Sequence, residues 1–165
     1  MSNELQLVLR GILIGIGATA VLDVWIALLK LTFGMQSRSW AIVGRWVGHF
    51  PRGRFVHESI AKAEPIPHEL ALGWAFHYFI GALYGLLLVG LWGIEWARQP
   101  SLLPALVVSL LMLAAPFFVM GPAIGDGIAA SKSANPTTAG LRSLVNHTVF
   151  GVALYACARL TALLF

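Results

Sequence analysis

Four long apolar runs dominate the pattern of hydrophobic and polar positions along the chain. Each run exceeds the roughly 20 residues that an α-helix needs to cross the hydrocarbon core of a bilayer. They predict membrane spans at about residues 6–33, 69–96, 101–123 and 139–165. The pattern therefore predicts an all-α fold, an integral membrane bundle of four transmembrane helices that forms a single membrane domain over residues 1–165.

Proline and asparagine mark the predicted boundaries and distortions of these helices. Asn135 and Pro136 fit an N-cap and a first-turn proline before the fourth span. Pro116 and Pro122 lie inside the third span, where proline frees backbone carbonyls and bends a helix. We expect this bend near the depth of the ionisable residues described below.

The longest polar segment, residues 34–68, is expected to hold a short helix in the membrane interface. Apolar residues recur there at three- and four-residue spacing until Pro51: Trp40, Val43, Val47 and Phe50. His49, His57 and His68 in the same segment are spaced by eight and eleven residues, which fits no compact metal-ligand motif. We therefore predict that these three histidines lie on the surface.

Composition and charge place the chain in a membrane and give it an orientation. Hydrophobic residues make up 58% of the chain and charged residues only 11%, with a net charge of +4. Eight of the eleven Lys and Arg residues flank or lie in the connections on one side: Lys30, Arg38, Arg45, Arg52, Arg54, Lys62, Lys132 and Arg142. Because cytoplasmic loops carry the excess of Lys and Arg, the 34–68 loop is predicted to be cytoplasmic and both termini periplasmic. The same residues indicate contact with the bilayer rather than with nucleic acid.

Three ionisable residues inside the apolar runs form the candidate functional site: Asp23, His77 and His147. An ionisable side chain at membrane depth costs roughly 2.5 to 3.5 kcal/mol on insertion scales. Such a residue therefore indicates a polar partner, a cavity or a function. At ~1.5 Å of rise per residue, the three lie roughly 8 to 12 Å from the loop-side ends of their helices. We therefore expect them to share one layer and to form a single polar site.

Small and polar neighbours extend this predicted site and its helix contacts. The supporting residues are Thr19, Tyr84, Ser143, Asn146 and Met120. Trp25, Trp74 and Tyr78 lie near the same layer and are interpreted as aromatic core packing. A GxxxG-type surface of Gly11, Gly15 and Gly17 favours close approach of a helix, either an internal neighbour or a second copy of the chain.

Five stretches of the chain also resemble a known family. They are GIGATAVLDVWIALLK, VGRWVGHFPRGRFVHESIA, ALGWAFHYFIG, APFFVMGPAIGDGIAASKSANP and RSLVNHTVFG. Together they look like the bacterial membrane family DUF2938. This resemblance implies an inner-membrane protein with four spans, but it implies no particular activity, because the family has no known function. The polar, charged and proline residues within these stretches are Asp23, Arg45, Arg52, Arg54, His57, His77, Pro116, Pro122, Asp126, Ser131, Lys132, Arg142 and His147.

Three functions fit the sequence. In the first, Asp23, His77 and His147 bind or pass a divalent metal ion, a proton or a small polar solute, since two imidazoles and a carboxylate are a ligand set for zinc or iron. Histidine also titrates near neutral pH, which suits a proton relay. A four-helix chain is small for such a pathway, so a homodimer through the glycine faces is expected.

The second and third functions need different partners. In the second, His77 and His147 ligate a b-type haem, although the many glycines favour closer packing. In the third, the chain is a scaffold or accessory subunit with a structural polar cluster, and Arg45, Arg52 and Arg54 contact lipid headgroups or a partner. The sequence holds no phosphate-binding loop or nucleophile elbow, which disfavours an enzyme. Catalysis by a metal-bound water at the Asp/His site is left open.

Overall fold

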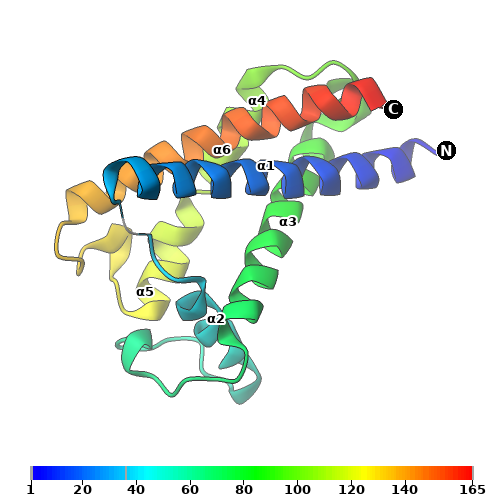
Figure 1. Ribbon diagram of the computed structural model, residues 1–165. Coiled ribbons are helices and arrows are strands. Elements are labelled where there is room, and N and C mark those ends of the chain that lie inside the picture. Colours follow the sequence, from blue (N-terminus) through cyan, green and yellow to red (C-terminus); the bar gives the residue numbers. More distant parts are fainter. Residues whose placement is uncertain (1, 36, 165) are drawn as a thin grey trace. The chain divides into compact units, whose positions relative to one another are not determined.

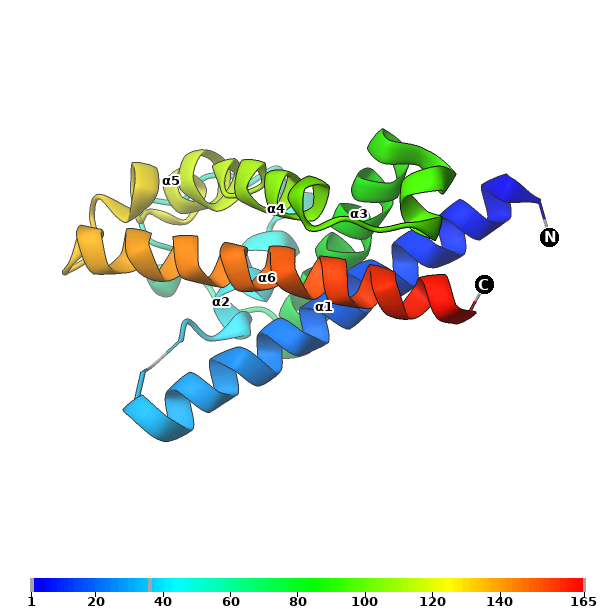
Figure 2. The same cartoon turned by 90° about the horizontal axis from the view of Figure 1, so that it is seen from above.

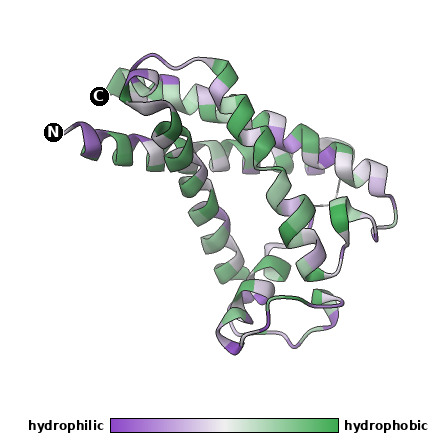
Figure 3. Cartoon of the chain, turned by 180° about the vertical axis from the view of Figure 1, so that it is seen from behind, coloured by the Kyte–Doolittle hydropathy of each residue, from purple (hydrophilic) through white to green (hydrophobic). Residues whose placement is uncertain are grey.

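The computed structural model describes residues 2–35 and 37–164, and this part of the chain is helical, with no strand. Four helical stretches are long and apolar enough to cross a membrane: Asn3–Phe33, Glu69–Arg98, Leu102–Ile124 and Pro136–Leu164. Their positions agree closely with the predicted spans. The all-α prediction with four membrane-spanning candidates is therefore confirmed, and Figure 3 shows the hydrophobic colour along most of the Glu69–Arg98 helix.

The first two of these helices are bounded by local backbone signals. Helix α1 (Asn3–Phe33) begins after Ser2, whose hydroxyl accepts from the Leu5 amide at 3.3 Å, and ends at Gly34 with φ 64°. It runs as one unbroken ribbon (Figure 1). Helix α3 (Glu69–Arg98) contains a kink at Gly93, where φ is 75°. Glycine adopts this left-handed conformation without the steric cost that a Cβ adds, which explains the kink near the end of the predicted span.

The third candidate span is distorted where the prolines predicted a bend. Helix α4 (Leu102–Leu111) is followed by a π-helical segment, η3 (Ala115–Met120), and then by α5 (Gly121–Ile124). The Gly121 amide donates to the Pro116 carbonyl, a five-residue spacing that defines the π-turn. Because proline has no N–H to continue the regular ladder, the wider turn is the physical consequence of Pro116.

The described residues divide into two compact units. Unit 1 contains the described residues within the ranges 1–36, 78–111 and 146–165. Unit 2 contains residues 37–77 and 112–145. Helix α3 and helix α6 (Pro136–Leu164) each contribute to both units. The single membrane domain over residues 1–165 stays a prediction.

Close helix contact through glycine organises unit 1. A Cβ added at Gly15 would collide with the Gly81 carbonyl, and one added at Gly85 would collide with the Gly11 carbonyl. Two small-xxx-small faces, one on α1 and one on α3, therefore meet backbone to backbone. Gly17 faces Cys157 of α6 instead. The internal alternative for the predicted glycine surface is confirmed, and a homodimer through these faces gains no support.

A second contact in unit 1 joins α4 and α6, which lie side by side in Figure 2. Gly151 of α6 approaches Leu106 and Ser109 of α4. The Ser109 hydroxyl, which is fully buried, donates to the His147 carbonyl. Tyr84 of α3 packs edge-on against Phe150, with ring centroids 6.0 Å apart. The polar side chain of Ser109 is thus satisfied by the backbone of a neighbouring helix.

Unit 2 is built around a short helix, α2 (Trp40–Gly48), which confirms the helix predicted before Pro51. Gly44 of α2 lies against the Glu69 carbonyl, and Gly73 of α3 lies against the Trp40 carbonyl, so both glycines are required for close packing. The core consists of Trp46, Ile60, Ala123 and Ile124, with Phe50, Phe76 and Met120 packed around it. Two one-turn helices, η1 (Phe50–Arg52) and η2 (Ile60–Lys62), carry the chain from α2 towards α3.

Candidate functional site

Asp23 lies on α1 in the middle of an apolar helix and has a partner on α3. The Tyr78 hydroxyl donates to the Asp23 carboxylate with an oxygen-to-oxygen distance of 2.9 Å. Both side chains are half-buried within the protein. Tyr78, interpreted from the sequence as aromatic packing, is therefore the hydrogen-bond donor that fixes this carboxylate.

A second polar contact in unit 1 lies one half-turn further along α1. The Trp25 indole N–H donates to the Asn146 side-chain oxygen of α6 at 3.2 Å. The next residue on α6, His147, offers its backbone carbonyl to Ser109. The Asp23 and Trp25 contacts join α1 to α3 and to α6 respectively, so unit 1 contains a polar pairing on each side of α1.

His77 belongs to unit 2, where aromatic rings surround it. Its ring stacks on Trp40 with centroids 3.9 Å apart and an interplanar angle of 26°, and Trp74 meets it edge-on at 5.8 Å. Asp23 and His147 belong to unit 1, so the meeting of the three predicted site residues stays a prediction. Across residues 2–35 and 37–164, no three His, Cys, Asp or Glu side chains form a group that could hold a metal ion.

The predicted supporting residues are spread over both units. Thr19 is buried and its hydroxyl bonds back to the Gly15 carbonyl at 2.8 Å, beside the close contact of α1 and α3. Asn146 caps the Trp25 indole, and Tyr84 packs on Phe150. Met120 packs against the core of unit 2, and Ser143 also lies in that unit. Through Trp25, Asn146 completes a polar contact between two helices of unit 1.

Arg45 is committed to the interior of unit 2. Its Nε and one terminal nitrogen donate to the two Glu69 carboxylate oxygens, both at 2.8 Å, in a bidentate pair. Its other terminal nitrogen faces the carbonyls of Ile60, Ala61 and Ala63 at 3.2 to 3.4 Å. The hydrogen bond with Glu69 raises the pKa of Arg45 above its usual value. Arg52 and Arg54 are exposed, and the predicted contact of the three arginines with lipid or a partner stays a prediction.

His49 and His57 are buried, so the prediction of surface positions is wrong for both. Their side chains are 0% and 8% exposed, and His57 Nε2 lies 3.1 Å from His49 Nδ1. The chain reverses at Gly53, with φ 71°, and the Arg54 amide returns to the His49 carbonyl at 3.3 Å. This reversal brings together two residues that the eight-residue spacing seemed to separate. His68 is exposed, as predicted.

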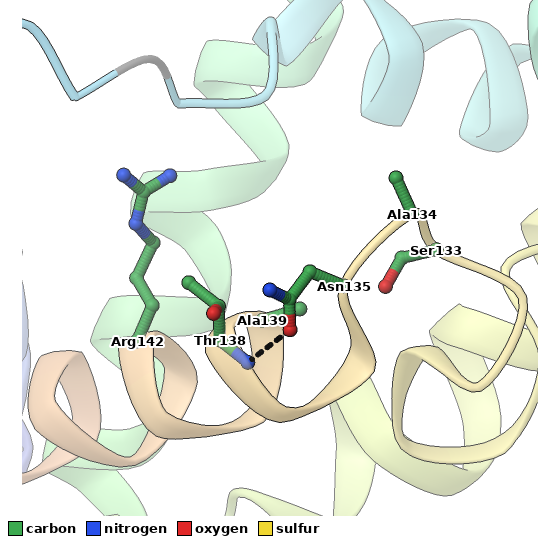
Figure 4. A pocket seen from close by; sticks show the side chains of 6 residues that line it. All are labelled: Ser133, Ala134, Asn135, Thr138, Ala139 and Arg142. Carbon is green, nitrogen blue, oxygen red and sulfur yellow. Dashed lines mark hydrogen bonds between the residues drawn. The ribbon is translucent and has the colours of Figure 1, made fainter.

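A hollow of about 300 Å³ lies in unit 2 at the start of α6 (Figure 4). Its lining is Ser133, Ala134, Asn135, Thr138, Ala139 and Arg142. The Asn135 side-chain oxygen accepts from the Thr138 amide at 3.1 Å, which confirms the predicted N-cap before Pro136. In Figure 4 Arg142 rises from the following turn of the helix. Half of the lining residues are exposed and half are half-buried, and the Asn135 side chain serves the helix itself by capping it.

The comparison with protein families identifies the chain. A family described as "Protein of unknown function (DUF2938)" matches residues 12–161. The chain belongs to the DUF2938 family. No curated protein and no solved structure matches it.

The DUF2938 match covers every site residue discussed above, and it confirms the resemblance drawn from the five stretches. Two of the contacts that sequence reasoning missed in this DUF2938 protein join a candidate residue to a near neighbour in the fold. Tyr78 follows His77 directly, and its place in the same layer as Asp23 was the signal for their pairing. The His49 and His57 pair had a weaker signal, the Pro-Arg-Gly turn at residues 51–53 that folds the chain back.

Proposed function

We propose that this DUF2938 protein crosses the bacterial inner membrane four times and binds or passes a proton or a small polar solute at a site centred on Asp23. The observation that carries the proposal is the hydrogen bond from Tyr78 to a carboxylate in the middle of an apolar helix. Such a carboxylate costs several kcal/mol at membrane depth, and ionisable residues there commonly mark ion pathways and proton relays.

The Tyr78 hydroxyl suits a carboxylate that changes its protonation state. A phenolic hydroxyl both donates and accepts, so it can donate to the Asp23 carboxylate and accept from the protonated acid. The pair can therefore persist through a protonation cycle at a distance such as the 2.9 Å observed. A purely structural role would be served by a neutral amide at lower cost, which favours a role that uses the charge.

His147, which lies in unit 1 with Asp23, enters the proposal as a further member of the pathway. Histidine side chains serve as proton relays near neutral pH, which suits this position. A metal ion or a haem at His77 or His147 predicts a different outcome in the test below. The ligand-free scaffold, with Asp23 and Tyr78 only fastening α1 to α3, is the competing function.

Proton flux in reconstituted vesicles tests the proposal. Purified protein is inserted into vesicles that hold a pH-sensitive dye, and a potassium diffusion potential drives protons inward. We expect flux with the wild-type protein and none with Asp23→Asn, which keeps the shape and removes the titratable group. Asp126→Asn is the matched control, because it makes the same change in the loop carboxylate that pairs with Arg38.

Equal flux in the wild-type and Asp23→Asn vesicles would refute a proton pathway through Asp23. If neither protein gives proton flux, and equilibrium dialysis with a series of small polar solutes detects no binding, the scaffold function would be favoured. An optical scan and elemental analysis of the same sample test the metal and haem alternatives. A Soret band, or a stoichiometric metal, that disappears in His77→Ala would favour a haem or metal site over the proton pathway.

The orientation and the lipid contact belong to the same proposal. The loop of residues 34–68 would face the cytoplasm, with both termini in the periplasm, and Arg52 and Arg54 would meet anionic headgroups. Val56, which is 73% exposed, offers a position for a cysteine in a Cys157→Ala background. A maleimide that cannot cross membranes should label this cysteine in inverted vesicles and leave it unlabelled in spheroplasts. The reverse result would invert the proposed topology.

A further inference from the structure

The hydrogen bonds of His49 and His57 determine which ring nitrogens carry protons. His49 Nε2 lies 3.0 Å from the Glu64 carbonyl. A carbonyl only accepts, so His49 Nε2 carries the proton, and Nδ1 of the neutral ring is the acceptor. His57 Nε2, at 3.1 Å from that Nδ1, must therefore be the donor. The neutral His57 ring is left with a bare lone pair on Nδ1.

The surroundings of the pair disfavour a further proton. Within the described residues, His57 Nδ1 makes no hydrogen bond, and it is buried. Burial, the neighbouring His49 ring and the charge of Arg54 hold the pKa of His57 below its usual range, while the Ala123 carbonyl opposes them in part. The Glu64 carboxylate lies towards Arg52, at 3.7 Å, and so does not balance a charge on the pair.

The pair also sits where the loop is attached to the third candidate span. The His57 amide donates to the Ala123 carbonyl of α5 at 2.8 Å. On the same segment, the Phe55 carbonyl accepts from the Trp46 indole at 2.8 Å. The segment from His49 to Glu64 is thereby fastened to α2, through Trp46 and Arg45, and to α5 through the His57 amide. Loss of the histidine contact would loosen the second attachment.

We propose that the His49 and His57 rings form an acid-sensitive clasp, which holds the segment 49–64 against α5 when both rings are neutral and releases it when both are protonated. With both rings protonated, His49 Nδ1 and His57 Nε2 are two donors face to face, and the contact breaks. A proton on His57 Nδ1 would bury a cation beside Arg54. The open form avoids both costs, so acid favours it. The clasp concerns unit 2 alone and does not depend on the proposed role of Asp23.

The sign of the pH dependence follows from linkage. A histidine whose pKa is lowered in the closed form binds fewer protons there than in the open form. The closed form is therefore stabilised above the usual histidine pKa of about 6.5 and loses that stability as the pH falls through the histidine range. Release on acidification, rather than on alkalinisation, is the distinguishing expectation.

Hydrogen exchange on the full chain in detergent tests the clasp. The protection factor of the segment 54–60, taken relative to the intrinsic exchange rate at each pH, is measured from about pH 7.5 to about pH 5, across the range where histidine titrates. We expect the protection factor to fall as the pH falls through this range, because the pKa of His57 is held low in the closed form. The start of α6, residues 136–145, contains no histidine and serves as the internal control.

His57→Gln is the decisive variant, because the Gln amide can donate to His49 Nδ1 and does not titrate. It should keep the protection of the wild-type protein at neutral pH and retain it in acid. If this variant fails to fold, nitrogen NMR of the histidine rings in the wild-type protein decides the question. His57 should then show a protonated Nε2 and should titrate below the usual histidine pKa of about 6.5. Titration of His57 at or above that value, or an equal loss of protection in acid for wild type and His57→Gln, would overturn the clasp.

Discussion

Replacement of Arg45 by Ala should destabilise unit 2 far more than any other loss of a loop cation. The Arg45 and Glu69 side chains are only 13% and 19% exposed, and their carboxylate and guanidinium groups meet in two parallel hydrogen bonds of 2.8 Å. Removal of one partner from a buried pair typically costs 3 to 5 kcal/mol, because the other charge stays buried. Partial exposure of this pair places the expected loss near the lower end, at about 3 kcal/mol.

The assay is thermal unfolding followed by circular dichroism in a mild detergent. A loss of about 3 kcal/mol corresponds to a fall in Tm of roughly 6 to 12 °C for a chain of this size, at about 2 to 4 °C per kcal/mol. Arg45→Lys keeps the charge but loses the fork that matches a carboxylate, so its Tm should fall between those of Ala and wild type. Arg52→Ala is the matched control, since Arg52 is 56% exposed and lies 3.7 Å from Glu64, and its Tm should change little.

A double-mutant cycle isolates the contact itself. When Arg45→Ala is combined with Glu69→Gln, the buried carboxylate charge is no longer stranded, so the double variant should lose less stability than the sum of the two single variants. Two results would refute the reasoning. One is an Arg45→Ala protein whose Tm equals that of Arg52→Ala. The other is strict additivity of the losses in stability in the double-mutant cycle.

Two further predictions concern unit 1. Gly15→Val should lower Tm strongly or prevent folding, at a cost of about 3 kcal/mol or more, because its Cβ would strike the Gly81 carbonyl, whereas Gly90→Ala, with open space at its Cβ, should leave Tm unchanged or slightly raised. Tyr78→Phe should cost about 1.5 to 3 kcal/mol by removing a hydrogen bond to a charged group, read as a lower Tm. Tyr84→Phe, whose hydroxyl makes no hydrogen bond within the described residues, should stay within about 0.5 kcal/mol of wild type, and equal shifts for the two tyrosine variants would contradict the assignment.

The spans could be predicted from the sequence because their signal is local. A run of 20 apolar residues must satisfy its own backbone as a helix, whatever lies around it. Local rules also gave the N-cap at Asn135 and the distortion at Pro116, since each depends on residues within one turn. The kink at Gly93 was not predicted, because glycine inside an apolar run is compatible with a regular helix and with a left-handed turn alike.

The candidate site was harder to predict, because the position of a residue in a helical sequence gives its depth along the helix but does not show which side chains on other helices it contacts. The predicted depth of Asp23 is consistent with its contact to Tyr78, a residue one position away from the histidine considered at that level. The choice between adjacent positions rotates a side chain by about 100° around the helix axis, and only the packing of α1 on α3 decides it. Contacts in the loop, such as that of His49 and His57, depend on tertiary reversal and leave almost no periodic signal.

Polar side chains that satisfy backbone carbonyls differ from the Asp23 carboxylate, which satisfies none. In unit 2, long polar side chains satisfy backbone carbonyls of a segment that has little helix of its own: Arg45 reaches residues 60 to 63, Trp46 reaches Phe55 and His49 reaches Glu64. A buried carbonyl needs such a donor, so these residues are explained by the loop they stabilise. In unit 1 Arg10 and Ser109 likewise donate to the carbonyls of Ala97 and His147, whereas the Asp23 carboxylate only accepts and therefore satisfies no carbonyl. A polar residue that the backbone does not require is the stronger candidate for function, which is why Asp23 rather than the basic loop stands at the centre of the proposed activity.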